Sequence, residues 1–222
     1  ASLISAIKNT LIVSGLAALI TVTLALLMVY GIRLSGKKLP LLILPLTTIG
    51  YAAPGAVLGI GILVPLAFFD NWLADRIFDL TRYDPGLIFT GTAFAIILAY
   101  CVRFFSIAQQ TVDGALGRVS PSLPNAARSL GRNKLQVLWE IYRPLISAST
   151  ATALLLVFVD CVKELPATML LRPFNFETLA TRVHVQASLE DLPNAAPGAI
   201  LIVLIGLCAV FLLARVNKQI PH

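Results

Sequence analysis

Charged side chains are scarce in this 222-residue chain. Only 13% of the residues are Asp, Glu, Lys or Arg, whereas 58% are hydrophobic, and the mean hydropathy is +0.87. A soluble domain carries about 25% charged residues, so this chain has too few polar groups to cover its surface in water. The scarcity excludes an ordinary soluble domain and predicts a protein embedded in lipid.

Clustered cysteine and histidine are missing too. Cys101, Cys161 and Cys208 lie in separate apolar runs, and their odd number and spacing fit neither a closed disulfide set nor a metal site. We expect them to be small buried hydrophobic residues. His184 stands alone, and metal ligands come in clusters, so no metal site is predicted. No strand pattern is present, nor the clustered His, Asp or Cys that a membrane enzyme would need.

A bilayer core needs about 20 apolar residues in a helix, and five charge-free runs give the candidates: 9–32, 39–69, 85–102, 144–159 and 192–214. They predict spans at about 9–32, 40–69, 86–110, 145–164 and 196–215, some of which reach past the charged residue that ends the run. The second run is too long for one straight crossing and contains Pro45, Pro54 and Pro65. It predicts a broken or kinked helix, which a membrane tolerates where protein or a cavity satisfies the freed backbone groups. The fold class is therefore an all-α polytopic membrane helix bundle, a single transmembrane domain over 1–222.

The basic residues predict the orientation of this bundle. Five crossings place eleven basic and two acidic residues on one side, a net charge of +9, and leave −3 on the other. Basic loops stay in the cytoplasm, so residues 70–86 and 165–191 are expected in the periplasm. The overall charge of +6 is then a topology signal, and no nucleic-acid partner is predicted. The amino terminus comes out external, which predicts that a further helix or an upstream half precedes it.

The longest cytoplasmic loop, 111–144, contains the polar stretch "NAARSLGRNKLQVLWEIYRPL" at 125–145. Its apolar residues keep helical spacing on either side of Gly131, which favours two short amphipathic helices joined by a bend. Pro124 can start the first helix, and Pro144 marks the return to the membrane. The residues alone leave two interpretations open. The segment is either an interfacial helix held on anionic lipid by its arginines or a docking site for a cytoplasmic partner.

The same stretch resembles the "EAA" loop of ABC importer permeases, whose pattern is Glu-Ala-Ala, three residues, Gly, nine residues, Ile, one residue, Leu-Pro. Five positions match at fixed spacing: Ala126, Ala127, Gly131, Ile141 and Pro144. Asn125 stands where the pattern has Glu, although Asn can still cap a helix, and Arg143 stands where it has Leu. The run "NTLIVSGLAALITVTLALLMVYGIR" is similar to the first core helix of the same family. The resemblance implies the fold of a type I ABC importer transmembrane domain.

In that family the loop is the coupling helix, which sits in a groove of the ATP-binding subunit. The resemblance therefore implies a coupling site in this chain, formed by Asn125, Ala126, Ala127, Leu130, Gly131, Ile141 and Pro144. No P-loop pattern G-x-x-x-x-G-K-[ST] occurs, so this chain is expected to bind no cofactor and to perform no catalysis. ATP and magnesium are expected in a partner dimer of ATP-binding subunits. The other implied partners are a periplasmic substrate-binding protein, a second permease half, fused or separate, and membrane lipid.

The stretch 160–188 bears on the substrate. Asp160 and Glu164 are four residues apart, which would place both on one helix face, and ionisable residues at membrane depth are candidates for a substrate path or gate. The alternative is a self-neutralising cluster with Lys163 near the headgroups. Pro166 is expected to end this helix, and residues 176–188 are expected to form a short amphipathic helix.

The string "KELPATMLLRPFNFETLATRV" resembles ferric-iron importer permeases, which are often one polypeptide with two homologous halves; this chain looks like the carboxy-terminal half. Ferric iron would suit carboxylates, because hard cations prefer oxygen ligands. Related permeases carry thiamine, polyamines, phosphonates or sulfate, and these substrates stay open. A secondary transporter, which would need no nucleotide-binding partner, is the remaining alternative class.

Overall fold

The computed structural model describes residues 2–35, 47–120 and 122–218, and within these ranges the chain forms helices and loops without a strand. The elements are α1 (Leu3–Ser35), α3 (Ile49–Ala52), α4 (Gly55–Thr81), α5 (Ala93–Gly117), α6 (Ser122–Ser129), α7 (Lys134–Val137), the π-helical turn η2 (Leu138–Tyr142), α8 (Arg143–Val162), α9 (Pro166–Leu171), α10 (Leu179–Ser188) and α11 (Leu192–Lys218). The all-α prediction is confirmed.

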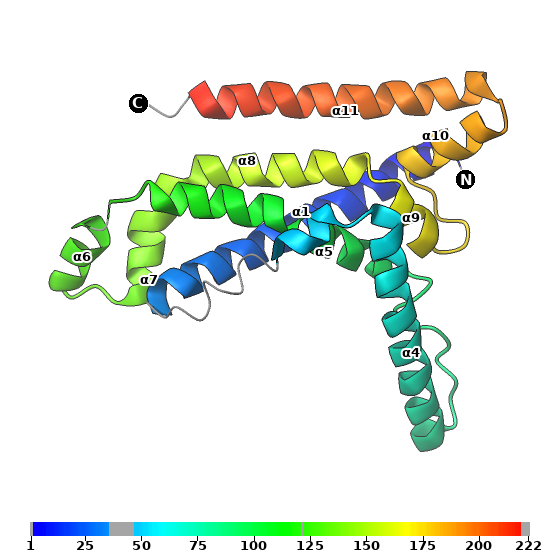
Figure 1. The fold of residues 1–222 in the computed structure, drawn as a ribbon, viewed down its shortest axis with the longest axis horizontal. Coiled ribbons are helices and arrows are strands. Elements are labelled where there is room, and N and C mark those ends of the chain that lie inside the picture. The colour runs from blue at the N-terminus through cyan, green and yellow to red at the C-terminus, as the bar shows by residue number, and fades with distance from the viewer. Residues whose placement is uncertain (1, 36–46, 121, 219–222) are drawn as a thin grey trace.

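Helices α1, α5 and α8 pack directly against one another and form the core of the bundle (Figure 1). Their contact faces are rich in fully buried alanines, including Ala17, Ala25, Ala99 and Ala153. Small side chains let helix backbones approach closely, which is how membrane helices gain packing energy without a hydrophobic driving force. The sequence of the core thus suits lipid as its solvent.

In the part of the chain that the structure describes, five helices are long and apolar enough to cross a membrane, which agrees with the number predicted from the sequence. These spans are 3–33, 55–81, 93–117, 135–162 and 192–216. The predicted second span ended at residue 69, yet α4 continues to Thr81. The third span, predicted from residue 86, starts at residue 93 because 82–92 is a loop. Residues 40–46 of the predicted second span lie outside the described residues.

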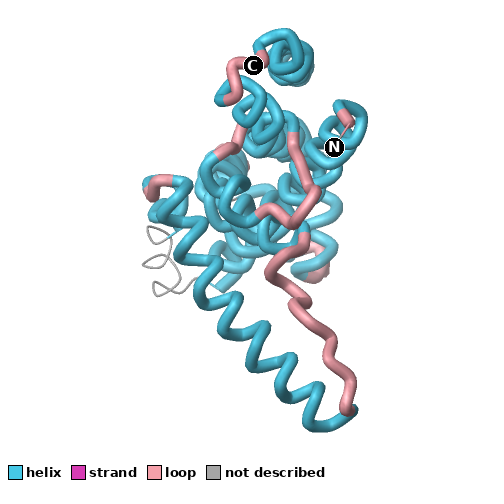
Figure 2. The backbone as a smooth tube through the Cα atoms, turned by 90° about the vertical axis from the view of Figure 1, so that its right-hand side faces the viewer, coloured by secondary structure: helices cyan, strands magenta, loops and turns pink. Residues whose placement is uncertain are grey.

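Asp70 does not end α4 because its carboxylate is fully satisfied inside the protein. It is completely buried and accepts hydrogen bonds from the backbone N–H groups of Ile88, Phe89 and Thr90 and from the Thr90 hydroxyl, the last at 2.6 Å. These bonds hold the return loop alongside α4 (Figure 2). Asp70, which looked in the sequence like the end of a membrane span, is therefore a buried residue that fixes the loop 82–92 to α4.

The predicted break in the second span is confirmed. Helix α3 ends at Ala52, Ala53 has extended backbone angles, and α4 begins directly after Pro54. Pro54 supplies no N–H, which suits the start of a helix. Pro65, in contrast, lies inside α4 without ending it.

The two peripheral spans are much less covered than the core. Only 17% of the apolar stretch of α4 and 6% of that of α11 is buried, against 44% for α1 and α5. In Figure 1, α4 projects away from the bundle and α11 runs along one side. Cys101 and Cys161 are buried as predicted, but Cys208 on α11 is exposed, so that prediction was wrong for Cys208.

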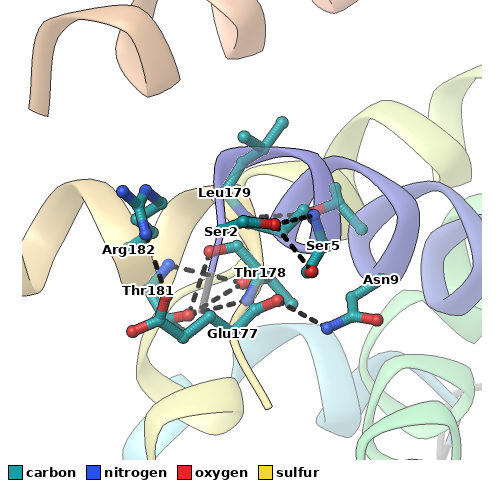
Figure 3. A network of polar contacts seen from close by, with 10 residues as sticks. Ser2, Ser5, Asn9, Glu177, Thr178, Leu179, Thr181 and Arg182 are labelled. Atoms are coloured by element: carbon teal, nitrogen blue, oxygen red, sulfur yellow. Dashed lines mark hydrogen bonds and ion pairs between the residues drawn. The ribbon is translucent and has the colours of Figure 1, made fainter. Parts of the chain in front are cut away.

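Helix α10, expected from residues 176–188, is fixed to the start of α1 (Figure 3). Thr178 and Thr181 form a reciprocal capping box at its first turn. The Leu179 N–H donates to the Thr10 hydroxyl at 2.8 Å, and Asn9 donates to the Glu177 carbonyl. The bundle therefore has two distinct ends. One carries the amino terminus, α9 and α10; the other, here called the basic end, carries α6, α7, η2 and the ends of α1, α5 and α11 (Figure 1).

Candidate functional site

Helix α6 stands apart at the basic end (Figure 1), ends at Ser129 and is followed by a Schellman motif with Gly131 as its left-handed residue. The Arg132 N–H bonds the Ala127 carbonyl at 3.0 Å, and the Gly131 N–H bonds the Arg128 carbonyl at 2.9 Å. Gly131 has φ +83°, a left-handed conformation that a residue with a Cβ resists. The predicted bend at Gly131 is confirmed, and its geometry is defined by backbone hydrogen bonds.

The next helix begins with a second capping box. The Asn133 side chain accepts from the Gln136 N–H at 2.8 Å, and the Gln136 side chain accepts from the Asn133 N–H at 2.9 Å. Arg132 and Glu140 form an ion pair of 3.2 Å across this turn. The bend is thus closed on both sides by local interactions.

The second of the two expected short helices does not stop before the membrane. Helix α7 continues through η2 into α8, where the Arg143 N–H bonds the Leu138 carbonyl in a π-helical turn. Pro144 has no N–H to complete an α-helical turn, and the wider turn accommodates this loss. Ile141 lies within η2, and the Tyr30 and Tyr142 rings, 5.5 Å apart, hold η2 against α1.

Two details of the segment differ from the sequence prediction. Helix α6 begins at Ser122 rather than at Pro124, so Asn125 lies inside the helix and does not cap it. Helix α5 reaches Gly117, so the segment between the membrane spans starts later than residue 111.

The apolar side chains of this segment are left uncovered by the bundle. Leu123, Leu130 and Leu135 are 48%, 83% and 65% exposed, and Ala126 is exposed as well. In α6 only Pro124 is buried. An ordered helix that exposes its leucines and alanines is a surface for a partner or for lipid.

A second group of polar residues lies where two helix breaks meet. Arg103, from the middle of α5, pairs with Glu164 at 3.1 Å between Nε and Oε2, and both side chains are largely buried. The N–H of Nε is not aligned as a hydrogen bond, so the attraction is mainly electrostatic. Arg103 also donates to the Ala53 carbonyl at 2.8 Å, and Glu164 accepts from the Ala167 N–H. The pair therefore joins the break before α4 to the break between α8 and α9.

Glycines make this junction possible. A Cβ on Gly55 would lie 2.7 Å from Oε1 of Glu164, and one on Gly59 would lie 3.0 Å from the Leu170 side chain. Helix α4 packs against α9 through this close approach.

The sequence predicted that Asp160 and Glu164 share one helix face, and this prediction was wrong. Helix α8 ends at Val162, so Glu164 lies beyond it, and Pro166 starts α9 instead of ending a helix. Asp160 pairs with the exposed Lys163 at 2.6 Å. The hydrogen bond between the two side chains raises the pKa of Lys163 above its ordinary value. The two carboxylates therefore belong to separate ion pairs, one buried and one near the surface.

The geometry can be compared with known proteins. The model of the family described as "binding-protein-dependent transport system inner membrane component" matches residues 19–221. The chain belongs to this family. It is thus an inner-membrane permease component of a transport system, and five of its described helices are long and apolar enough to span that membrane.

Among curated relatives, the permease is 32% identical over 212 residues to the Fe(3+)-transport system permease protein FbpB 2 of Haemophilus influenzae, covering 96% of this chain and 39% of that protein. It is 28% identical over 186 residues to the ferric transport system permease protein FbpB of Actinobacillus pleuropneumoniae, covering 82% and 24%. A putative 2-aminoethylphosphonate transport system permease protein PhnV of Salmonella typhimurium is 28% identical over 172 residues, covering 76% and 58%. The chain spans well under half the length of the ferric relatives.

Among solved structures with this fold is a bacterial alginate ABC transporter in complex with an alginate pentasaccharide-bound periplasmic protein. Its TM-score is 0.70 at 19% identity, over 97% of the permease and 79% of that chain.

Arg103 was missed by the sequence reasoning, which counted it among the cytoplasmic loop residues. In the structure Arg103 lies in the middle of α5. The net charge predicted for the cytoplasmic side therefore falls from +9 to +8 and stays positive. A lone arginine ten residues into an apolar helix was the available signal. The Asn133–Gln136 capping box was also missed, although its spacing is visible in the sequence. Among the described residues, no three His, Cys, Asp or Glu side chains come together as a metal site.

Proposed function

We propose that this permease is the translocation part of an ATP-driven importer and that α6 and the Gly131 bend dock on its ATP-binding subunit. ATP and magnesium belong to that partner, working as a dimer, and this chain needs no cofactor of its own. A second permease half, fused or separate, and a periplasmic substrate-binding protein complete the assembly. The coupling residues are those of the "EAA" resemblance: Asn125, Ala126, Ala127, Leu130, Gly131, Ile141 and Pro144.

One observation carries the coupling role. The exposed amphipathic helix α6 is joined through a fixed bend to α7 and η2, and η2 continues without interruption into α8. Because α8 packs in the core against α1 and α5, a force applied at α6 reaches the membrane bundle through one continuous helix. A helix that merely rested on lipid would need neither the bend nor the rigid connection.

The docking role can be tested against the lipid-anchor interpretation. Ala127→Glu places a charge at the Schellman motif, where close approach is needed, and should abolish co-purification of the ATP-binding subunit while leaving membrane insertion intact. Replacing Arg128 and Arg132 together by Gln should have the smaller effect. The reverse order, with normal uptake in Ala127→Glu cells at wild-type protein levels, would support a lipid anchor instead.

The proposed cargo is ferric iron. Its support is the identity to two ferric permeases over most of this chain, whereas 2-aminoethylphosphonate relatives match a shorter part. Uptake of labelled ferric iron and of 2-aminoethylphosphonate should be compared in cells that express the full system. Energy-dependent phosphonate uptake without iron uptake would replace the cargo and keep the importer mechanism.

Glu164 and Asp160 are proposed at the gate of the substrate path, with different roles. The carboxylate of Glu164 is already matched by Arg103 and the Ala167 N–H, so it serves as a latch between α5, α4 and α9 rather than as a standing iron ligand. Asp160 is the more accessible carboxylate of the two.

A further inference from the structure

A groove at the basic end lies outside the coupling surface and the Arg103–Glu164 junction. It runs between the second half of α1 and the first half of α8, with Leu116 of α5 among its lining residues and η2 at one end, and its volume is about 500 Å³. The lining is almost entirely apolar. The hydroxyls of Ser147 and Thr150 that face it are already bonded to carbonyls of their own helix. The groove therefore offers few polar groups along its length and suits a hydrocarbon.

The length of the groove matches one leaflet of a bilayer. Its lining on α8 extends from Arg143 to Leu154, eleven residue steps, which corresponds to about 16 Å at 1.5 Å per residue. Half of a hydrocarbon core of about 30 Å is about 15 Å. An acyl chain of the leaflet at the basic end would therefore fill the groove from its polar mouth to its deep end.

The mouth of the groove carries a cation at the level where a headgroup would lie. The Arg143 guanidinium is 4.8 Å from the centroid of the Trp139 ring, and both residues are exposed. Arg33 and Arg132 at the same end pair with Asp113 and Glu140, but no described carboxylate lies within ion-pair distance of Arg143. Trp and Tyr are typical of the membrane interface, and Trp139 and Tyr30 both line the groove. The charge at the mouth is complementary to a phosphate group.

We propose that this groove binds an anionic phospholipid, with one acyl chain between α1 and α8 and the phosphate on Arg143. The proposal is independent of the coupling role of α6. It also gives a reason for arginine at position 143, where the "EAA" pattern has leucine. Because leucine is the residue of that pattern, Arg143→Leu removes the charge with little disturbance of the helix.

The test uses the assembled transporter that contains this chain, purified from phosphatidylcholine nanodiscs doped with phosphatidylglycerol and analysed by native mass spectrometry. Wild-type complexes should retain phosphatidylglycerol in preference to phosphatidylcholine. Arg143→Leu should reduce that preference about fivefold, the effect of one cation near an anionic headgroup, and Arg143→Lys should keep most of it. Ala151→Phe, which fills the groove without changing its charge, should also reduce retention.

Arg215→Leu is the matched control. Arg215 lies on the same basic end with its guanidinium 5.5 Å from the Phe211 ring, but it does not line the groove. Its replacement should leave retention unchanged. Equal losses in Arg215→Leu and Arg143→Leu would mean unspecific attraction to charge and would overturn the site. Unchanged retention in Ala151→Phe, or a cross-link from a cysteine at position 151 to a helix of the second permease half, would overturn it too.

Discussion

The two ends of α8 are built in opposite ways. At its start the chain is exposed: Leu123, Leu130 and Leu135 are uncovered, and the Gly131 bend is held by local backbone bonds, a capping box and the Arg132–Glu140 ion pair. Just beyond its other end the chain is buried, and an ion pair between Arg103 and Glu164 ties together three helices. The first end is available to a partner, and the second connects elements of the same chain.

This difference indicates how one helix can serve coupling. An exposed, locally closed segment can dock without support from the bundle, because its conformation is fixed by its own caps. A buried ion pair cannot be altered locally, because removing one partner leaves an uncompensated charge. A displacement of α8 at the exposed end would therefore also shift the Arg103–Glu164 junction at the buried end, where α4 is attached.

The largest expected effect is at the buried end. Glu164→Gln keeps an acceptor for the Ala167 N–H but leaves Arg103 without a counter-charge, which should lower the free energy of unfolding by about 3–5 kcal/mol. The double variant Arg103→Met with Glu164→Gln should recover most of that loss. Thermal unfolding in detergent measures both. A double variant less stable than the single one would show that the ion pair is not the cause.

The close approach at the same junction gives the next effect. Gly55→Ala would bring a methyl group against Glu164 and should cost about 1–3 kcal/mol, as overpacking does. Gly61→Ala on the same helix meets nothing within 4 Å and should be neutral or slightly stabilising. Equal melting temperatures for the two variants would contradict the tight junction.

The exposed end should respond locally and more weakly. Asn133→Ala removes the capping box and should destabilise the start of α7 by about 1 kcal/mol. Hydrogen exchange of the amides at 134–137 should rise about fivefold, while the amides near Arg103 stay unchanged. Asn125→Ala is the control, because that side chain does not cap α6. Faster exchange at the buried junction in Asn133→Ala would mean that the two ends are one cooperative unit.

The smallest effect is expected at the exposed pair beside the junction. Asp160→Asn removes the hydrogen bond that raises the pKa of Lys163, so that pKa should fall. Since the pKa is raised in the folded state, the contribution of the pair is complete at neutral pH and is lost only at alkaline pH, above the ordinary range of lysine. An NMR titration of methylated Lys163 measures the shift. An unchanged titration would remove Asp160 as the partner.

The sequence predicted the features that rest on local chemistry. Five apolar runs, the bend at Gly131 and a short helix within 176–188 follow from hydropathy, a glycine and a helix pattern, each readable within a few residues. The sequence prediction failed where the position of a residue depends on partners that are distant along the chain. Asp70 looked like the end of a span because its partners lie about twenty residues away, and Arg103 looked like a loop residue because Glu164 is sixty-one residues further on.

The site followed the same division. The coupling segment could be found from its spacing, whereas the separation of Asp160 from Glu164 depends on where α8 ends. That end is set at Val162 by a break whose partner, Arg103, lies on another helix. The continuity of α7, η2 and α8 was likewise hidden, because a proline normally predicts an interruption and a π-helical turn here absorbs it.

The central claim is that the Gly131 bend couples a partner ATPase to the membrane bundle. Its most direct test is the number of ATP molecules hydrolysed per substrate imported, measured in proteoliposomes with the full transporter. Gly131→Val strains a left-handed glycine by about 1–2 kcal/mol, and Gly86→Val imposes the same strain at φ +64° in a loop remote from α6. Gly131→Val should insert normally and raise this ratio severalfold, whereas Gly86→Val should leave it at the wild-type value. An unchanged ratio in Gly131→Val at normal uptake would contradict the account.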